Sequence, residues 1–149
     1  MQMTSKFTIA IHMIVAIDYF QNSEIVTSSF LAGSVGVNPV IVRNVMGDLK
    51  NAGILEISRG KSGMELAREP ENITFYDVYK AVDCVGGEGL FHFHEQPNAD
   101  CPVGRNIHKA LDDELTEIQR AMEEQMRAVK LSDIVNKIRG EIKKEAKHR

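Results

Sequence analysis

The spacing of apolar and polar residues between positions 27 and 68 predicts two helices followed by a β-hairpin. Apolar positions keep a helical period through residues 28–35 and again through residues 39–52. They then form short strand-like runs at 54–57 and 64–67, separated by a glycine-containing turn. A short helix, a turn, a longer helix and a hairpin follow one another in a winged helix-turn-helix.

The residues at the helix ends support this order. Thr27 and Asn38 suit N-cap positions, where a side-chain oxygen accepts hydrogen bonds from free backbone N–H groups. Gly36 suits the left-handed backbone that ends many helices. Pro39 suits the first helical position, where no N–H donor is needed. We therefore expect one helix to start at Thr27 and the next to start at Pro39.

The helix predicted over residues 39–52 has two different faces. Its apolar stripe, at i, i+3, i+4 and i+7, consists of Val42, Val45, Met46 and Leu49. The opposite face is polar, basic and free of acidic residues, and consists of Val40, Arg43, Asn44, Gly47, Lys50 and Asn51. Arg can read guanine, Asn can read adenine, and a valine can touch a thymine methyl group in the major groove. This face is the candidate DNA-reading surface, and the alternative is an ordinary solvated face.

The turn of the hairpin carries Arg59, Gly60 and Lys61 at its tip. Two cations on a glycine turn suit a wing that contacts phosphates or a minor groove. A solvated surface hairpin is the alternative interpretation. Ser28, at the start of the first of the two helices, and Lys50 are expected to anchor phosphates.

The apolar surfaces of two predicted helices outside residues 27–68 indicate that two copies of the chain associate. Residues 4–20 are apolar on nearly all sides, which indicates a helix buried from several directions, with His12 as a packed histidine. The pattern over residues 105–129 predicts the longest helix of the chain. Its apolar stripe resembles a coiled-coil seam and consists of Leu111, Leu115, Ile118 and Met122. An apolar stripe on so long a helix needs a partner. We expect the first helix to cover part of the seam and the same helix of a second subunit to cover the rest.

Two shorter helices complete the prediction. Residues 74–83 form one, in which Thr74 and Asp77 have the spacing of a capping box. The other is the last helix, with Ser132 as its expected cap. Its apolar residues are expected to face inward, and they are Ile134, Val135, Ile138 and Ile142.

Residues 84–104 read as a long loop, and they contain both cysteines of the chain, Cys84 and Cys101. In the first interpretation the loop is structural and its cysteines are inert. In the second, Cys84 and Cys101 form a thiol sensor. In the third, a metal or small-molecule site uses His92, His94 and Cys101 or His108. The sequence leaves all three open.

Composition, charge and the motifs present limit the classes of protein to which the chain can belong. A chain of 149 residues with 43% apolar residues suits one ordinary domain. The net charge is +1 over residues 1–68 and −4 over residues 69–149, so the acidity lies away from the candidate surface. We see no signal peptide and no apolar run long enough to span a bilayer, and we expect a cytoplasmic protein without a membrane partner. No phosphate-binding loop, nucleophile elbow or paired carboxylates stand out, so we expect no enzyme.

Short motifs along nearly the whole chain resemble the Rrf2 family of bacterial transcription regulators. They are NAGIL at 51–55, SRG at 58–60, LAR at 66–68, Pro70, IT at 73–74 and DV at 77–78. EQPN at 95–98 and CPVG at 101–104 are similar to a YwnA-like branch that lacks the iron–sulfur cysteines. The chain departs from the family at Ser62, Gly63 and Met64, where two glycines and an aromatic residue are common.

The resemblance implies that residues 105–129 form the dimerisation helix. It also implies that a cluster, where a family member has one, is held by three closely spaced cysteines in the loop before that helix. This chain has only Cys101 in the matching segment, with Cys84 upstream, so we expect no cluster and no other cofactor.

We therefore predict a mainly α fold with a small β-hairpin wing: a winged helix-turn-helix domain (1–83), a loop and possible sensor segment (84–104), and dimerisation helices (105–149). The predicted function is a sequence-specific DNA-binding transcription regulator, a repressor, that acts as a homodimer on a near-palindromic operator. A redox or small-molecule signal is expected to modulate it, and the effector is unknown. The DNA-binding candidates are Thr27, Ser28, Asn38, Pro39, Val40, Arg43, Asn44, Lys50, Arg59, Gly60 and Lys61. The alternative is a winged-helix module that binds protein instead of DNA.

Overall fold

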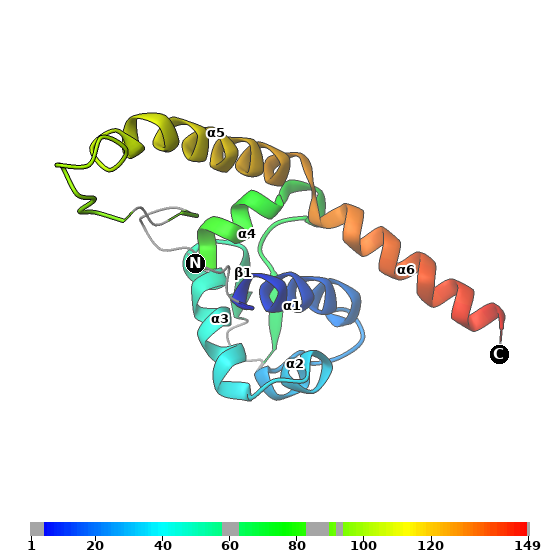
Figure 1. Cartoon of the computed structure of the whole chain (residues 1–149). Coiled ribbons are helices and arrows are strands. Elements are labelled where there is room, and N and C mark those ends of the chain that lie inside the picture. The colour runs from blue at the N-terminus through cyan, green and yellow to red at the C-terminus, as the bar shows by residue number, and fades with distance from the viewer. Residues whose placement is uncertain (1–4, 58–62, 83–89, 92–93, 149) are drawn as a thin grey trace.

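The computed structural model describes residues 5–57, 63–82, 90–91 and 94–148. That part of the chain is mainly helical, with one two-stranded sheet (Figure 1). The elements in order are α1 (Lys6–Phe20), α2 (Ser28–Val35), α3 (Pro39–Asn51), β1 (Leu55–Ile57), β2 (Met64–Leu66), the 3-10 turn η1 (Pro70–Asn72), α4 (Phe75–Val82), α5 (Ile107–Ala128) and α6 (Leu131–Lys147). The predicted fold class is confirmed.

Helix α1 lies at the centre of the core and contacts α2, α3, α4, α6 and β2. Its buried residues are Ile9, Ala10, Met13, Ile14, Ala16 and Ile17. A helix contacted from so many directions needs little polar surface, which explains its nearly continuous apolar sequence. The prediction for His12 was wrong, because this side chain is exposed and its Nε2 lies 3.0 Å from the hydroxyl oxygen of Ser34 on α2.

The ends of α2 and α3 are fixed as the sequence predicted. The Thr27 hydroxyl oxygen accepts from the N–H of Phe30 at 3.1 Å, and the Asn38 side chain accepts from the N–H of Val40 at 2.8 Å. Gly36 ends α2 with φ +80°, in the left-handed region that costs a glycine little. Gly36 and Asn38 thus define the short turn between α2 and α3.

The two strands pair in an antiparallel register that places Leu55 opposite Leu66 and Ile57 opposite Met64. The base of this hairpin is attached to the helical core by two hydrogen bonds. The N–H of Met64 donates to the carbonyl of Val26 at 2.9 Å, and the N–H of Leu66 donates to the Gln21 side chain at 3.1 Å. The hairpin therefore has a fixed position beside α2 and α3.

Helix α4 begins with the predicted capping box. The N–H of Thr74 donates to the Asp77 carboxylate at 3.0 Å, and the N–H of Asp77 donates back to the Thr74 hydroxyl oxygen at 3.1 Å. The same end of α4 holds the α5–α6 junction, because the N–H of Phe75 donates to the carbonyl of Val129 at 2.9 Å. This contact joins the last two helices to the core.

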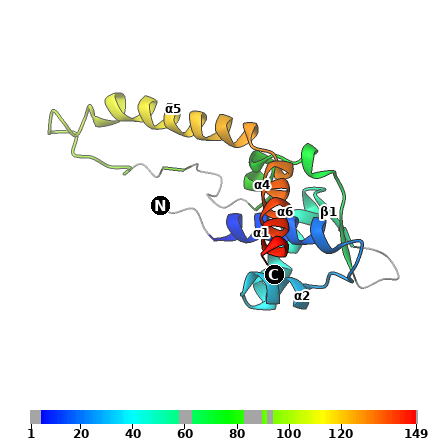
Figure 2. The ribbon, with the colours of Figure 1, turned by 90° about the vertical axis from the view of Figure 1, so that its right-hand side faces the viewer.

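Helix α5 leaves the core as an arm (Figures 1 and 2). None of its residues is buried. Its C-terminal end packs on α4, and there the Arg127 guanidinium lies 3.9 Å from the centre of the Tyr76 ring. The expectation that α1 would cover part of the seam was wrong. Helix α4 instead packs against the C-terminal end of α5, where Met122 and Met126 are partly buried, because the hydrogen bond between Phe75 and Val129 ties the end of α5 to the start of α4.

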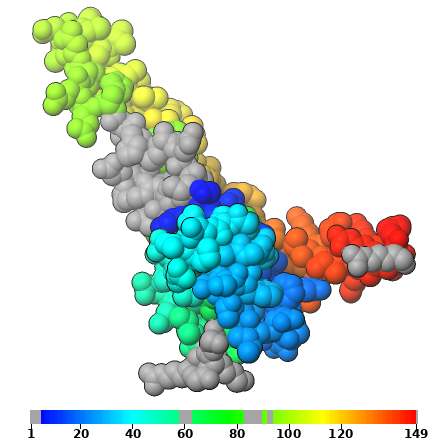
Figure 3. Space-filling model, turned by 90° about the horizontal axis from the view of Figure 1, so that it is seen from below, coloured from blue at the N-terminus to red at the C-terminus, as the bar shows by residue number. Residues whose placement is uncertain are grey.

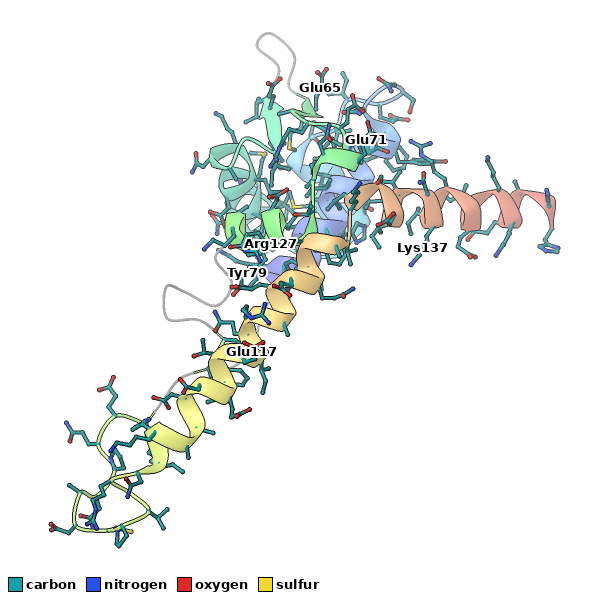
Figure 4. All side chains as sticks on the ribbon, turned by 90° about the horizontal axis from the view of Figure 1, so that it is seen from above. Glu65, Glu71, Tyr79, Glu117, Arg127 and Lys137 are labelled. Atoms are coloured by element: carbon teal, nitrogen blue, oxygen red, sulfur yellow. The ribbon has the colours of Figure 1, made fainter. Side chains whose placement is uncertain are left out.

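Helix α6 diverges from α5 and crosses α1, as Figures 2 and 4 show. The prediction that Ser132 caps it was wrong, since α6 starts at Leu131 and the Asp133 carboxylate accepts from the N–H of Lys130 at 3.0 Å. Val135 is buried, but Ile138 is 41% exposed, so its apolar stripe faces the core only at the start of the helix. No helix in the described ranges is long and apolar enough to cross a membrane.

Candidate nucleic-acid interface

Helices α2 and α3 form one continuous surface with the hairpin beside them. Figure 3 shows the surface of α2 next to that of α3 on one face of the molecule. Val42, Val45 and Leu49 of α3 are fully buried against the core, so the rotation of this helix about its axis is fixed. The opposite side of α3 therefore faces outward.

The outward face of α3 has the composition predicted for a DNA-reading surface. Arg43, Asn44 and Lys50 are exposed, and Val40 is 52% exposed. Among the described residues, no hydrogen bond or ion pair engages the side chains of Arg43, Asn44 or Lys50. These donors are therefore available to base edges and phosphates.

The single acidic residue of α3, Asp48, points away from this face. Its carboxylate lies 3.4 Å from the ammonium group of Lys6 on α1. The ion pair neutralises a charge that would repel phosphates at close range. Nothing in the sequence indicates that Lys6 pairs with Asp48, because the two residues are 42 positions apart.

The start of α2 lies against a shallow hollow of about 280 Å³. It is lined by Thr27, Ser28, Met46, Ile57 and Met64. The hollow brings together α2, α3 and the hairpin, which are the three elements that the sequence assigned to DNA binding. The hydroxyl of Thr27 is already used as a cap acceptor, whereas Ser28 at the first position of α2 is half-buried at its rim.

The predicted wing tip cannot be placed in the same way. Arg59, Gly60 and Lys61 lie outside the described residues, and so does Ser62. Gly63 lies at the base of the hairpin, where a Cβ atom would come within 3.3 Å of the Ile25 side chain. A Cβ atom at this position would require the exposed Ile25 side chain to shift by a few tenths of an ångström.

The four seam residues lie along the arm formed by α5. Leu111, Leu115 and Met122 are half-buried, and Ile118 is 53% exposed. Polar residues occupy the other sides of the helix, where Arg120 pairs with both Glu117 and Glu124. The helix thus presents an apolar stripe flanked by charged pairs.

The loop before α5 is packed onto that helix through His108. Its Nδ1 lies 3.0 Å from an Asp112 carboxylate oxygen, and its Nε2 lies 2.8 Å from the carbonyl oxygen of His94. The hydrogen bond that the His108 ring donates to Asp112 raises the pKa of His108 above its ordinary value, and the carbonyl of His94 acts in the same direction, since both acceptors favour the charged imidazolium. Cys101 is a half-buried free thiol, whereas Cys84 and His92 lie outside the described residues.

Comparison with known proteins connects this geometry to a family. Residues 3–137 match the model of the Rrf2 family, which is described as iron-dependent transcriptional regulators. The chain belongs to the Rrf2 family.

Three individual proteins are also similar to this chain. It is 39% identical to YwnA of Bacillus subtilis, described as an HTH-type transcriptional regulator, over 89% of this chain and 96% of YwnA. A solved structure described as a DNA-binding protein is 33% identical, with a TM-score of 0.68, and covers 87% of this chain and 98% of its own. A transcriptional regulator structure from Lactobacillus plantarum shares the fold, with a TM-score of 0.75 at 22% identity over 97% of this chain and 99% of its own.

The family description mentions iron, and the metal-binding side chains of this chain determine whether an iron–sulfur cluster fits. The resemblance implies a cluster held by three closely spaced cysteines, whereas this sequence holds only two cysteines, Cys84 and Cys101, far apart in the chain. Within the described ranges, no three His, Cys, Asp or Glu side chains converge on one point. Both ring nitrogens of His108 are already occupied by Asp112 and His94. The donor set of this Rrf2 protein does not fit the cluster.

The structure also shows a groove that sequence reasoning did not find. It has a volume of about 360 Å³ and lies between α1 and α6, with Ile11 and Val15 on one side and Ile134 and Ile138 on the other. His12 and Ser34 line it as well. The apolar stripe of α6 was read as inward-facing, and part of it instead forms this wall.

Proposed function

We propose that this Rrf2 protein is a sequence-specific transcription regulator that acts as a homodimer on a near-palindromic operator and represses transcription. The observation that carries the proposal is the outward face of α3. It is exposed, polar and free of acid, while Val42, Val45 and Leu49 on the opposite side fix its orientation. A helix held in this way can lie in a major groove with its side chains toward the bases.

The residues of this surface divide into two roles. Arg43 and Asn44 are the proposed base readers, because their side chains match guanine and adenine edges. Ser28 and Lys50 are the proposed phosphate contacts, together with Arg59 and Lys61 from the hairpin turn. Thr27, Asn38 and Pro39 begin the two helices and so place backbone N–H groups near the DNA backbone. Gly60 is the remaining candidate of the hairpin turn.

The proposed homodimer rests on the uncovered apolar stripe of α5, the helix that leaves the core as an arm. An amphipathic helix of 22 residues without a buried side chain is stable only if its apolar stripe is covered. Pairing of the stripe with the same stripe of a second copy covers Leu111, Leu115, Ile118 and Met122 about a two-fold axis. The two α3 helices are then related by that axis, which calls for half-sites separated by about one helical turn or a multiple of it.

The proposed domains follow the same division of roles. Residues 1–83 bind DNA, residues 105–149 pair the subunits, and residues 84–104 lie between them. A signal that alters this middle segment would change the spacing of the two α3 helices. A thiol reaction at Cys101, with or without Cys84, is the input we propose to test first.

A gel-shift titration with the DNA upstream of the chain's own gene tests the function. Binding should be tight on that fragment, weaker on a scrambled fragment of equal length, and steeply reduced as salt rises from 50 to 200 mM, by the order of about 10³ or more for several phosphate contacts. Equal, weak binding to both fragments would contradict sequence-specific recognition and favour a protein-binding module. A promoter–reporter fusion tests repression, since deletion of the protein should raise reporter output.

The signal is tested by the same titration. DNA affinity is compared for the reduced protein, the oxidised protein and the Cys101→Ser variant. A thiol sensor predicts that oxidation changes the affinity of the wild type and leaves that of Cys101→Ser unchanged. Identical affinities for all three would remove the thiol from the proposal without affecting DNA binding.

A further inference from the structure

Val40 occupies an unusual place on α3. It lies in the first turn of the helix and is 52% exposed, whereas Val42, Val45 and Leu49 of the core stripe are fully buried and Met46 is half-buried. Scattered exposed aliphatic residues are normal on a protein surface. Val40 differs because it lies on the side of α3 opposite the core, next to the exposed Arg43 and Asn44.

The position of Val40 can be fixed relative to its neighbours by helix geometry. Asn44 follows it by four residues, so the two side chains are adjacent on one side of α3. Ile41 is also exposed, at 40%, but it is rotated by about 100° from Val40 toward the flank that carries Asp48. That flank faces α1 through the ion pair of Asp48 with Lys6. Val40 is thus the apolar residue at the centre of the outward face, and Ile41 is not.

The chemistry of the major groove limits what an aliphatic side chain can recognise there. The thymine C5-methyl is the apolar group on the major-groove edges of the four base pairs, and Asn pairs with the N6 and N7 atoms of adenine. A surface that carries a valine beside an asparagine is therefore complementary to A·T pairs. The surrounding Arg43 and Lys50 supply the positive charge that holds such a surface against DNA.

We infer that Val40 is a specificity-determining residue that contacts a thymine methyl group, and that the base pairs facing the first turn of α3 are A·T pairs, with Asn44 on the adenine. The inference rests on the proposed DNA-binding function and deepens it. From the positions of Val40 and Asn44, it assigns A·T pairs to the part of each half-site that faces the first turn of α3.

Deoxyuridine tests the contact directly, because it lacks only the methyl group of thymidine and keeps its base-pairing edge. The bound region upstream of the gene is first located by footprinting, and each thymine in it is then replaced singly by deoxyuridine. We expect one thymine per half-site whose replacement weakens binding of the wild type by about fourfold, the effect of one buried methyl group. In Val40→Ala the same replacement should have no effect.

Two variants serve as matched controls. Ile41→Ala removes an exposed aliphatic group one residue away, and Val103→Ala makes the same chemical change at a residue that is 69% exposed in the loop before α5. Both should keep the deoxyuridine effect at full size. Thermal unfolding of each variant checks its fold, and the deoxyuridine scan of the wild type is informative without any variant.

Each outcome decides the matter. If the upstream DNA binds specifically but no deoxyuridine weakens binding, the thymine contact is overturned and the DNA-binding function stands. If the deoxyuridine effect is the same in the wild type and in Val40→Ala, the methyl acts through DNA shape and Val40 is not its reader. If Ile41→Ala abolishes the effect, the orientation of the first turn is wrong. If no fragment binds specifically, the proposed function fails together with the inference.

Discussion

The ammonium group of Lys6 on α1 lies 3.4 Å from the carboxylate of Asp48 on α3. This ion pair joins the central helix of the core to the candidate DNA-reading helix. It also removes the net charge of the one acidic side chain on α3. The consequence is a candidate DNA-reading helix whose outward face bears only neutral and positive groups.

Loss of Lys6 should therefore weaken DNA binding without unfolding the protein. We expect Lys6→Ala to reduce affinity several-fold at low salt, because the Asp48 charge is no longer balanced near the phosphates. Stability should change by less than about 1 kcal/mol, since both side chains of the pair remain partly open to solvent. The double variant Lys6→Ala with Asp48→Asn should regain most of the affinity in a gel-shift titration. A double variant as weak as Lys6→Ala would show that Lys6 contacts DNA itself.

Arg43 and Lys50 should differ in the kind of affinity they supply. We expect Arg43→Ala to cost about 1–3 kcal/mol on the operator and little on unrelated DNA, because a base contact is lost. Lys50→Ala should weaken binding to all sequences. It should also make the plot of log affinity against log salt concentration less steep, by about one in slope. Fluorescence anisotropy on operator and scrambled DNA at several salt concentrations measures both. Equal losses on both DNAs from both variants would contradict the division of roles, and Lys61→Ala repeats the Lys50 test at the hairpin turn.

Asn38 allows stability and DNA binding to be separated. Its side chain caps α3 by accepting from the N–H of Val40 at 2.8 Å. Asn38→Ala should destabilise the fold by about 1 kcal/mol in urea unfolding. Asn38→Asp should keep the cap, because a carboxylate accepts the same hydrogen bond, but it adds a negative charge near the proposed DNA backbone. We expect Asn38→Asp to be nearly as stable as the wild type and several-fold weaker in DNA binding.

Ile118 lies at the middle of the proposed dimer seam. We expect Ile118→Asp to yield monomers in analytical ultracentrifugation, because pairing would bury two opposed carboxylates in an apolar seam. Thr116→Asp on the same helix is the matched control and should stay dimeric, since Thr116 is exposed and outside the stripe. Loss of dimerisation should also lower operator affinity, as each monomer then binds one half-site. A dimeric Ile118→Asp protein would locate the interface elsewhere.

His108 should titrate above its ordinary pKa of 6.5, mainly because Asp112 hydrogen-bonds to it. A pKa raised by folding means that the charged form stabilises the folded loop. This contribution is complete below about pH 6.5 and is lost as the pH rises through the folded-state pKa. An NMR titration of the His108 ring protons measures the value. Asp112→Asn should lower it, and Asp113→Asn, at an exposed neighbour, should leave it nearly unchanged.

The sequence placed the ends of the helix-turn-helix accurately because those ends are local. Thr27, Gly36 and Asn38 act on backbone groups within a few residues, and the Thr74–Asp77 capping box does the same. The start of α6 was missed for a related reason. Ser132 is a good cap by residue type, but the N–H of Leu131 donates to the carbonyl of Ile73 at 2.8 Å, and this long-range contact accompanies a helix start two residues earlier, with Lys130 as the cap.

The amino-acid sequence by itself determined the order of elements, the buried side of α3 and its acid-free outward face, because these depend on helical period and local caps. Tertiary structure alone decided which element covers which. It placed α4, not α1, against the end of α5, turned His12 outward to Ser34, and paired Lys6 with Asp48. These contacts join residues far apart in the chain, and periodicity carries no information about which apolar stripes meet. The wing tip, from Arg59 to Lys61, stays a prediction from sequence.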